Sequence, residues 1–231
     1  MGKRIIQQAR GHGSLTYQVR KKAYIYRVGY PLVTGKAKVI DIIDSSAHSA
    51  PLAKIAFEQK IFYNLAPQGM IVGDEIVMGD GNKPGDIVEL GKIPTGTAVY
   101  NIENAPGDGG KMVRSAGSHA TVVKKLGNKV SVLMPSKKEA HLDVRCRATL
   151  GIIAGNGRLD KPILKAGKKW HMMKARNKLW PRTSAVKMNA IDHPFGSGRG
   201  KRIKSKIAKR NAPPGARVGL LRPKRTGRKK R

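Results

Sequence analysis

Short apolar runs rich in Val, Ile and Leu recur along the first two thirds of the chain, and Gly, Pro, Asn and Asp separate them. This alternation is typical of β-strands joined by tight turns. It predicts strands at residues 38–43, 53–57, 75–78, 97–102, 121–126, 129–134, 140–144 and 148–153. So many short strands with frequent turns indicate small β-barrels, and the expected fold class is mainly β.

Turn residues sort these strands into groups. Gly127-Asn128 separates two apolar-alternating runs, and glycine followed by asparagine readily adopts the positive φ angles of a two-residue hairpin turn. Glycine-rich loops at 80–85 and 105–110 interrupt the series further. We therefore place a domain boundary near Gly85.

One segment, residues 165–178, has a convincing helical pattern. Trp170, Met173 and Trp180 fall close to one face of a 3.6-residue period. Lysines and arginines occupy the rest of the circumference, and Pro181 ends the run. Two roles are open for the Trp and Met stripe. It packs the helix on the second barrel, which we favour, or it stacks on nucleic-acid bases.

The net charge changes this picture from a plain β protein to a binder of polyanions. The 231 residues have a formal net charge of +33 at pH 7, more than solubility requires. Each cation that neutralises a phosphate releases counterions, so nucleic acid is the expected partner. A membrane is not expected, because every apolar run is far shorter than the roughly 18 residues of a membrane span. Residues 1–10 are not followed by the apolar stretch of a secretory signal, so we expect a cytoplasmic protein.

The cations are concentrated toward the C-terminus. Residues 150–231 hold 25 of the 47 Lys and Arg residues but only two of the 14 acids, Asp160 and Asp192. A segment so poor in apolar residues cannot offset a backbone ordering cost of about 1–2 kcal/mol per residue. From Gly196 onward we expect the chain to fold only on its partner.

Residue patterns for catalysis or metal binding are lacking. The glycine-rich segment before Lys111 lacks the spacing of a phosphate-cradling loop, and a calcium loop beginning at Asp80 would place Pro84 at a ligand position. Cys146, the single cysteine, cannot form an internal disulfide, and we expect it to be buried. We therefore expect no enzyme, no metal site and no cofactor. The sequence leaves open whether Mg²⁺ bridges acidic side chains to phosphate.

Two basic, glycine-rich connections, residues 105–117 and 151–158, are the most informative positions. Glycine lets backbone amides approach phosphates closely, and Arg114 and Arg158 lie within these segments. Ordinary turn formation is the alternative, and composition alone slightly favours it.

An acidic group precedes these connections. It consists of Asp74, Glu75, Asp80, Asp86 and Glu89. The group would repel phosphate, so it should face away from nucleic acid. We favour a solvated loop over a docking site for a basic neighbouring protein.

Four stretches of sequence carry a resemblance to a known family. They are GDGGK at 107–111, CRATLGIIAGNGRLDKPILKAGKKWHMMKAR from Cys146, MNAIDHPFGSGRG from Met188, and RNAPPG from Arg210 followed by KRTG from Lys224. Together they closely resemble the second protein of the large ribosomal subunit, in its archaeal or eukaryotic-like form. The resemblance extends over most of the chain, from Gly2 to the C-terminus.

The resemblance implies a fold and a division into segments. The fold would be an OB-fold-like barrel followed by an SH3-like barrel, with one short basic helix and extended basic termini. The segments would be an N-terminal basic extension (1–34), the OB-like barrel (35–84), the SH3-like barrel (85–164), a basic helix and loop (165–195) and a basic C-terminal tail (196–231).

The resemblance also implies a function. The chain would be a structural constituent of the large ribosomal subunit in the cytoplasm, with large-subunit ribosomal RNA (rRNA) and other ribosomal proteins as partners. It would support association with the small subunit and organisation of the peptidyl transferase region. The residues expected to contact rRNA are Arg114, Arg147, Arg158, Lys165, Lys168, Lys169, His171, Lys174, Arg176, Arg182, Arg199, Lys201 and Arg202.

Asp192 and His193 match the family loop nearest the peptidyl transferase centre. We expect His193 to order this loop by hydrogen bonding to RNA, because a general base must lie within about 3.2 Å of the proton it removes and in this family the chemistry is attributed to RNA. Phe195 stands where the bacterial branch often has a second histidine, which weakens the case for a two-histidine relay.

The alternative function is that of a free RNA chaperone or a nucleoid-like DNA-packaging protein, which basic tails and small barrels also suit. A packaging protein has no need for the long motifs around Cys146 and His193. The sequence therefore favours the ribosomal interpretation.

Overall fold

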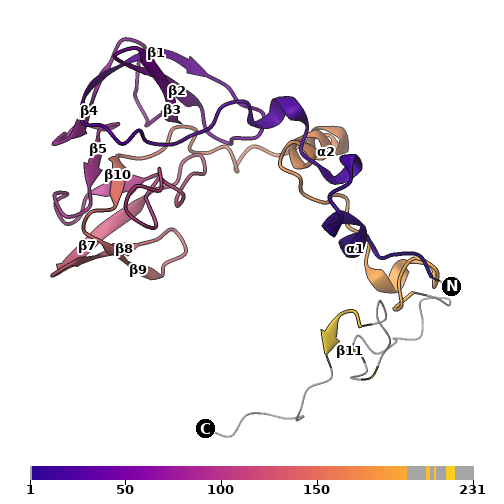
Figure 1. Ribbon diagram of the computed structural model, residues 1–231. Helices are drawn as coiled ribbons and strands as arrows, with labels where there is room; N and C mark the ends of the chain where they lie inside the picture. Colours follow the sequence, from indigo (N-terminus) through magenta and orange to yellow (C-terminus); the bar gives the residue numbers. More distant parts are fainter. Residues whose placement is uncertain (1, 197–206, 209–210, 212–216, 222–231) are drawn as a thin grey trace, which may run out of the picture. The chain divides into compact units, whose positions relative to one another are not determined.

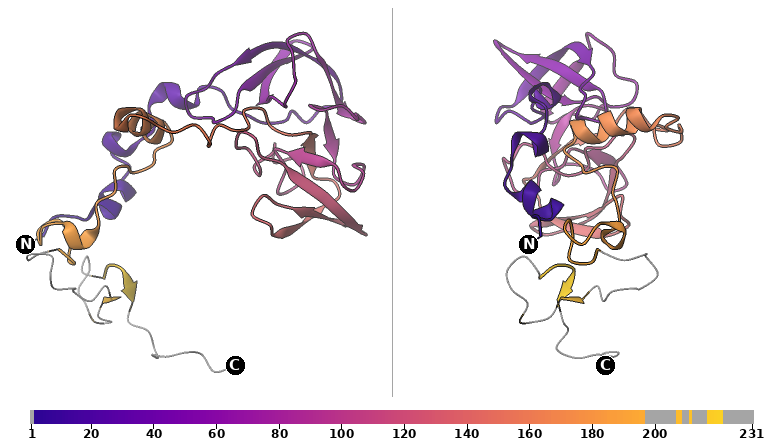
Figure 2. Two further views of the ribbon diagram at one scale, coloured as in Figure 1. Left: turned by 180° about the vertical axis from the view of Figure 1, so that it is seen from behind. Right: turned by 90° about the vertical axis from the view of Figure 1, so that its right-hand side faces the viewer.

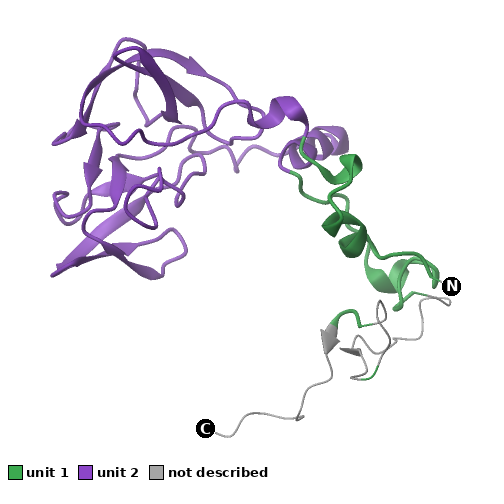
Figure 3. Ribbon diagram, in the orientation of Figure 1, with its two compact units in different colours: residues 1–19, 177–231 green, residues 20–176 purple. Residues whose placement is uncertain are grey.

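The computed structural model describes residues 2–196, 207–208, 211 and 217–221. The chain forms two compact units, one of residues 20–176 and one that combines residues 1–19 with residues 177–231 (Figure 3). Each unit is described by itself below.

The unit of residues 20–176 is built on a single ten-stranded sheet (Figure 1). In space the strands follow the order β3-β2-β1-β4-β5-β10-β6-β7-β8-β9. Their bounds are β1 Gly35–Ile43, β2 Leu52–Phe57, β3 Lys60–Leu65, β4 Glu75–Gly79, β5 Ile87–Glu89, β6 Ala98–Tyr100, β7 Ala120–Leu126, β8 Lys129–Leu133, β9 Glu139–Asp143 and β10 Arg147–Leu150. The mainly β fold class is thus confirmed.

Buried apolar side chains of this unit form three clusters. The first includes Val39 and Ile55 of β1 and β2, and the second includes Val122 and Val132 of β7 and β8. Buried apolar and exposed polar side chains alternate in the first part of β1, up to Val39, as expected for a strand with one face toward a core. A smaller third cluster contains the fully buried Tyr100. This arrangement is consistent with an OB-like barrel followed by an SH3-like barrel.

All the strands expected from the sequence are present, and two more occur in the same unit. β3 was missed because its hairpin with β2 turns without glycine or asparagine, and Glu58 adopts the positive φ of 50° in their place. β5 was missed because three residues are too few to show a period. The expected hairpin between β7 and β8 is confirmed, with Gly127 at φ 55°.

Helix α2 spans Ala166–Ala175 and is shorter than the predicted 165–178. The expected packing of its Trp and Met stripe on the second barrel is wrong, because no residue of α2 is buried. The centre of the Trp170 ring instead lies 5.7 Å from the guanidinium carbon of Arg20. Arg20 directly precedes the 3₁₀ turn η2 (Lys21–Tyr24).

The second unit joins the two ends of the chain. It contains helix α1 (Ile6–Gly11), the 3₁₀ turns η1 (Leu15–Tyr17) and η3 (Ala185–Lys187), and the parallel pair β11 (Ile207–Ala208) and β12 (Leu220–Leu221), none of which the sequence predicted. The Lys3 amide donates to the Ile191 carbonyl at 2.8 Å, and the Arg10 guanidinium donates to the Asn177 carbonyl at 3.0 Å. The expectation that the tail folds only on its partner concerns residues that lie mostly outside the described ranges.

The grouping of the chain termini in the structure can be compared with the expected division into five segments. Residues 1–19 group with residues 177–196, and residues 20–34 group with the barrels. The boundary near Gly85 falls between β4 and β5, which pair directly in parallel, so one sheet continues across it. The division itself remains a prediction.

Candidate nucleic-acid interface

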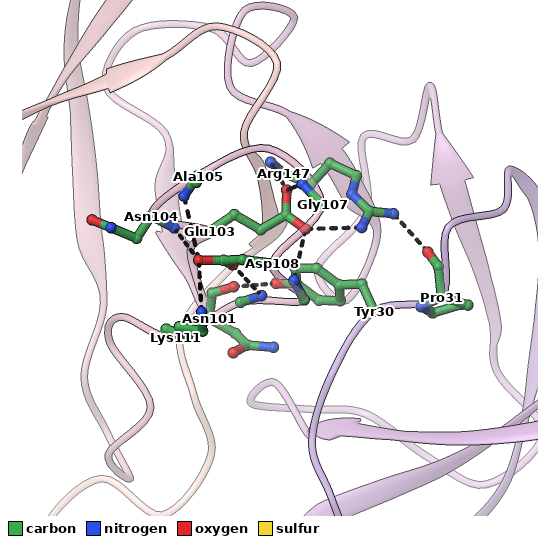
Figure 4. A network of polar contacts seen from close by, with 12 residues as sticks. Tyr30, Pro31, Asn101, Glu103, Asn104, Ala105, Gly107, Asp108, Lys111 and Arg147 are labelled. Atoms are coloured by element: carbon green, nitrogen blue, oxygen red, sulfur yellow. Dashed lines mark hydrogen bonds and ion pairs between the residues drawn. The ribbon is translucent and has the colours of Figure 1, made fainter.

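Glu103 organises the first basic, glycine-rich connection from inside the protein (Figure 4). Its side chain is fully buried, and its carboxylate accepts hydrogen bonds from the amides of Gly107 at 3.2 Å and Gly109 at 3.1 Å. The Arg147 guanidinium donates to Oε1 at 2.8 Å, and the Arg147 amide donates to Oε2 at 2.8 Å. Burial raises the pKa of Glu103, but these donors, Arg147 foremost, more than compensate and hold it below its usual value.

Asp108 completes the same loop. Its carboxylate accepts hydrogen bonds from the amides of Asn104 at 3.1 Å, Ala105 at 3.3 Å and Gly110 at 3.0 Å. The protein's own carboxylates therefore occupy the amides of residues 107, 109 and 110. The interpretation that these amides cradle a phosphate is wrong, since their donors are already satisfied.

Arg147 and Arg114, two of the expected RNA contacts, tie the N-terminal segment to the barrels. The Arg147 guanidinium donates to the Pro31 carbonyl at 2.6 Å and lies 5.5 Å from the centre of the Tyr30 ring. The Arg114 guanidinium donates to the Val28 carbonyl at 2.8 Å. Only 17% of the Arg147 side chain is exposed, so most of its surface serves the fold. Contact of these two arginines with RNA stays a prediction.

The acidic group is also used within the fold. Asp86 is buried and accepts hydrogen bonds from the amides of Val77 and Lys83, both at 2.8 Å. Asp80 forms a 2.7 Å ion pair with Lys92. The expectation of a purely solvated loop is therefore wrong for Asp86, whose carboxylate stabilises the turn between β4 and β5.

The ends of the two basic, glycine-rich connections meet at a cavity of about 490 Å³. Gly117, at φ 71°, lies against Asn156 at this meeting point. Polar lining comes from Ser115, Ser118, His119, Thr121, Asn156, Arg158 and the carboxylate of Asp160. The Nε atom of Arg158 is buried and has no hydrogen-bond partner among the described residues. A buried donor without a hydrogen-bond partner costs free energy of folding, and Arg158 carries one next to this cavity.

Replacing Gly117 by Ala is expected to lower the free energy of unfolding by about 2 kcal/mol or more, because the strained φ costs about 1–2 kcal/mol and the added Cβ would lie 2.7 Å from the Asn156 Cα. Gly127→Ala is the matched control, since its φ is also positive but nothing lies within 4 Å of the added Cβ. Urea denaturation of both variants measures the difference. Equal losses would contradict the close approach of the two loops.

Helix α2 and the residue before it carry five of the residues predicted to bind RNA. Lys165, Lys168 and His171 are exposed, and Lys169 and Lys174 are half-buried. The first turn of α2 has no acidic residue. The His171 ring packs edge-on against Trp170 with 4.9 Å between centroids. An exposed basic helix with an aromatic pair matches the surface expected of an RNA-binding element.

Arg176 follows α2 directly and is also half-buried. Beside the Tyr24 ring lies His48, whose ring centroid is 5.4 Å away. Burial lowers the pKa of His48, and the positive charges of Arg114 and Arg176 lower it further. The positive charges of Arg114 and Arg176 thus both lie close enough to His48 to oppose its protonation.

The loop with Asp192 and His193 belongs to the other unit. His193 is buried, and its Nδ1 accepts the Phe195 amide at 3.0 Å. In the neutral ring the proton therefore resides on Nε2, which can donate. Asp192 pairs with Lys3 at 3.7 Å, and Arg182 is exposed in the same unit. The loop is thus ordered by contacts within the chain.

Three expected RNA contacts, Arg199, Lys201 and Arg202, lie outside the described residues. Within the described ranges, no group of three or more His, Cys, Asp or Glu side chains could hold a metal ion. In the same part of the chain, no helix is both long and apolar enough to cross a membrane. Cys146 is buried, as expected, and burial raises its pKa.

Comparison with known proteins identifies the family. Residues 83–215 match the family model described as "Ribosomal Proteins L2, C-terminal domain". The large ribosomal subunit protein uL2 of Archaeoglobus fulgidus is 45% identical over 236 residues, which cover 98% of this chain and 99% of the relative. That of Methanococcoides burtonii is 45% identical over 237 residues, which cover 99% of this chain and all of the relative. Because the likeness extends over both chains from end to end, the protein belongs to the uL2 family of the large ribosomal subunit.

Proposed function

We propose that this chain binds large-subunit rRNA through helix α2, the cavity at Gly117 and Arg158, and the loop of His193. As a member of the uL2 family, it is a structural constituent of the large ribosomal subunit and not an enzyme. It works in the cytoplasmic ribosome, with rRNA and other ribosomal proteins as its partners. The observation that carries the proposal is the coincidence of this family with the basic side chains of α2, where Lys168 is exposed and Lys169 and Lys174 are half-buried.

Phosphate and sugar contacts should dominate, because they position a protein on RNA without reading its sequence. The residues proposed to make them are Arg158, Lys165, Lys168, Lys169, His171, Lys174, Arg176 and Arg182, with Arg199, Lys201 and Arg202 from the tail. Arg114 and Arg147 have intramolecular partners, so we expect them to contribute mainly by holding the barrels and residues 28–31 together.

A free RNA chaperone or DNA-packaging protein is the other candidate. Sedimentation of cell extract through a sucrose gradient separates the two. We expect the protein to co-sediment with large subunits and to stay there after DNase treatment. If it sedimented chiefly as free protein or with DNA, the ribosomal function would be wrong.

We propose that the loop of His193 supports subunit association and the peptidyl transferase region through its order. His193→Ala removes the acceptor of the Phe195 amide, so the loop should loosen. Subunits carrying this variant are expected to join more slowly or to transfer peptide more slowly, with an unchanged dependence of the peptidyl transfer rate on pH. The loss of one titration step from the pH-rate profile, with the RNA structure intact by chemical probing, would contradict the positioning role.

A further inference from the structure

A cavity of about 740 Å³ lies within the unit formed by the two ends of the chain. Its walls come from residues 3–7 at the start of α1 and from residues 179–193. Figure 2 shows these indigo and orange segments next to each other. A hydrogen bond from the Lys3 amide to the Ile191 carbonyl holds the two segments together at this point. The volume falls within the range of about 300–1,000 Å³ that is usual for ligand pockets.

The lining has two kinds of surface. An apolar part is formed by Ile6, Leu179, Pro181, Ala185 and Met188. Cations are supplied by Lys3, Arg4 and Arg182, and all three are exposed. Apolar surface suits the flat face of a base, and guanidinium groups suit a phosphate, which they can bind through two parallel hydrogen bonds.

The lining also contains hydrogen-bonding groups. Thr183 and Ser184 supply hydroxyls, and His193 also lines the cavity. The His193 Nδ1 atom is engaged with the Phe195 amide, so the Nε2 proton is the one available for donation. The carboxylate in the lining, Asp192, is 3.7 Å from Lys3, which offsets its repulsion of a phosphate. The cavity therefore combines the groups that bind the base, the 2′-hydroxyl and the phosphate of a ribonucleotide.

We propose that this cavity takes one unstacked nucleotide of single-stranded RNA, with its base against the apolar part and its phosphate at Arg4 and Arg182. A duplex would present only its backbone, because paired bases are stacked and cannot reach an apolar wall. The inference deepens the proposed rRNA binding by assigning a nucleotide site to the unit that carries His193. The N-terminal helix α1 is then part of the binding site as well as of the fold.

The test compares two alanine-to-tryptophan variants of the full chain. Ala185 lines the cavity, whereas Ala190 is exposed in the same segment and does not line it. The probe is a short single-stranded RNA with 2-aminopurine at its centre, titrated at a salt concentration that suppresses phosphate-only binding. We expect the fluorescence change of the wild type to persist in Ala190→Trp. Ala185→Trp should lose it and bind at least tenfold more weakly.

A second pair of variants leaves the cavity walls in place. Arg182→Gln should weaken binding of the same probe about fivefold or more, because it removes a phosphate contact. Lys178→Gln, an exposed cation of the same unit outside the cavity, should have less effect. Equal losses from Arg182→Gln and Lys178→Gln, or wild-type binding by Ala185→Trp, would overturn the nucleotide site.

Binding of full-length rRNA distinguishes this failure from that of the proposed function. If the wild type binds rRNA tightly but gives no fluorescence change with the probe, only the nucleotide site is refuted. If the wild type binds neither, the proposed function fails too. A matching change with the same 2-aminopurine strand in a fully paired duplex would also refute the site, since a paired base could not enter it.

Discussion

Glu103→Gln is expected to lower the free energy of unfolding by about 3–5 kcal/mol, because it leaves the partly buried Arg147 charge without its carboxylate. The side-chain NH2 of the glutamine would also point its donors at backbone amides, which in the wild type donate to the Glu103 carboxylate. Because Gly107 donates to Oε2 and Gly109 to Oε1, one of these two amides would face the NH2 group and lose its acceptor. Urea denaturation, followed by circular dichroism, measures the loss.

Asp143→Asn is the matched control for this substitution. Asp143 also pairs with an arginine, Arg145, at 3.1 Å, but this pair lies at the surface, where salt and water screen it. We expect the control to unfold almost as the wild type does. A Glu103→Gln protein as stable as the control would mean that the Glu103 network contributes nothing to folding.

The same network predicts a dependence of stability on pH. The pKa of Glu103 is lowered in the folded protein, as is that of Asp108, whose amide donors outweigh its burial. The stability they contribute is therefore complete above the ordinary carboxyl pKa and is lost as the pH falls below about 4.5. Glu103→Gln should lose less stability than the wild type between neutral pH and acid. If the two proteins lost the same stability in acid, Glu103 would not be a source of the pH dependence.

Short-range patterns predicted most of the fold. Alternation and turn residues located the strands, and glycine at position 127 located a hairpin, because both signals arise within a few residues. The turn at Glu58 gave no such signal, since glutamate rarely adopts positive φ. Helix α1 was missed because its short run lacks an apolar stripe long enough to show a period.

The candidate site was harder to predict, since its contacts join distant parts of the chain. The sequence identified the loops at 105–117 and 151–158 as basic and glycine-rich, but not that Glu103 would fill the first from within. The hydrogen bond from Arg147 to the Pro31 carbonyl joins residues that are 116 positions apart in the sequence. One signal was available, because Glu103 is an acid beside the loop in a strongly basic chain. The cavity lined by residues 3–7 and 179–193 had no signal in the sequence.

Alanine at Lys168, Lys169 and Lys174 together is expected to weaken binding of large-subunit rRNA strongly. Each phosphate contact contributes roughly 0.7–0.9 to the slope of log affinity against log salt, so the slope should fall by up to about two to three. The loss should be largest at low salt and should shrink as salt rises, because counterion release drives these contacts. Filter binding over a range of salt concentrations measures both quantities.

The control is a second triple variant, with alanine at Lys36, Lys60 and Lys129, which are exposed strand residues of the barrels and do not line the cavity at Gly117 and Arg158. It removes the same charge, so any effect of net charge on long-range attraction is equal in the two proteins. A difference in slope between them therefore reports direct phosphate contacts at α2. If both variants changed the slope equally, α2 would be only one cationic surface among many, and the RNA-binding role would belong to the charge of the whole chain rather than to this helix.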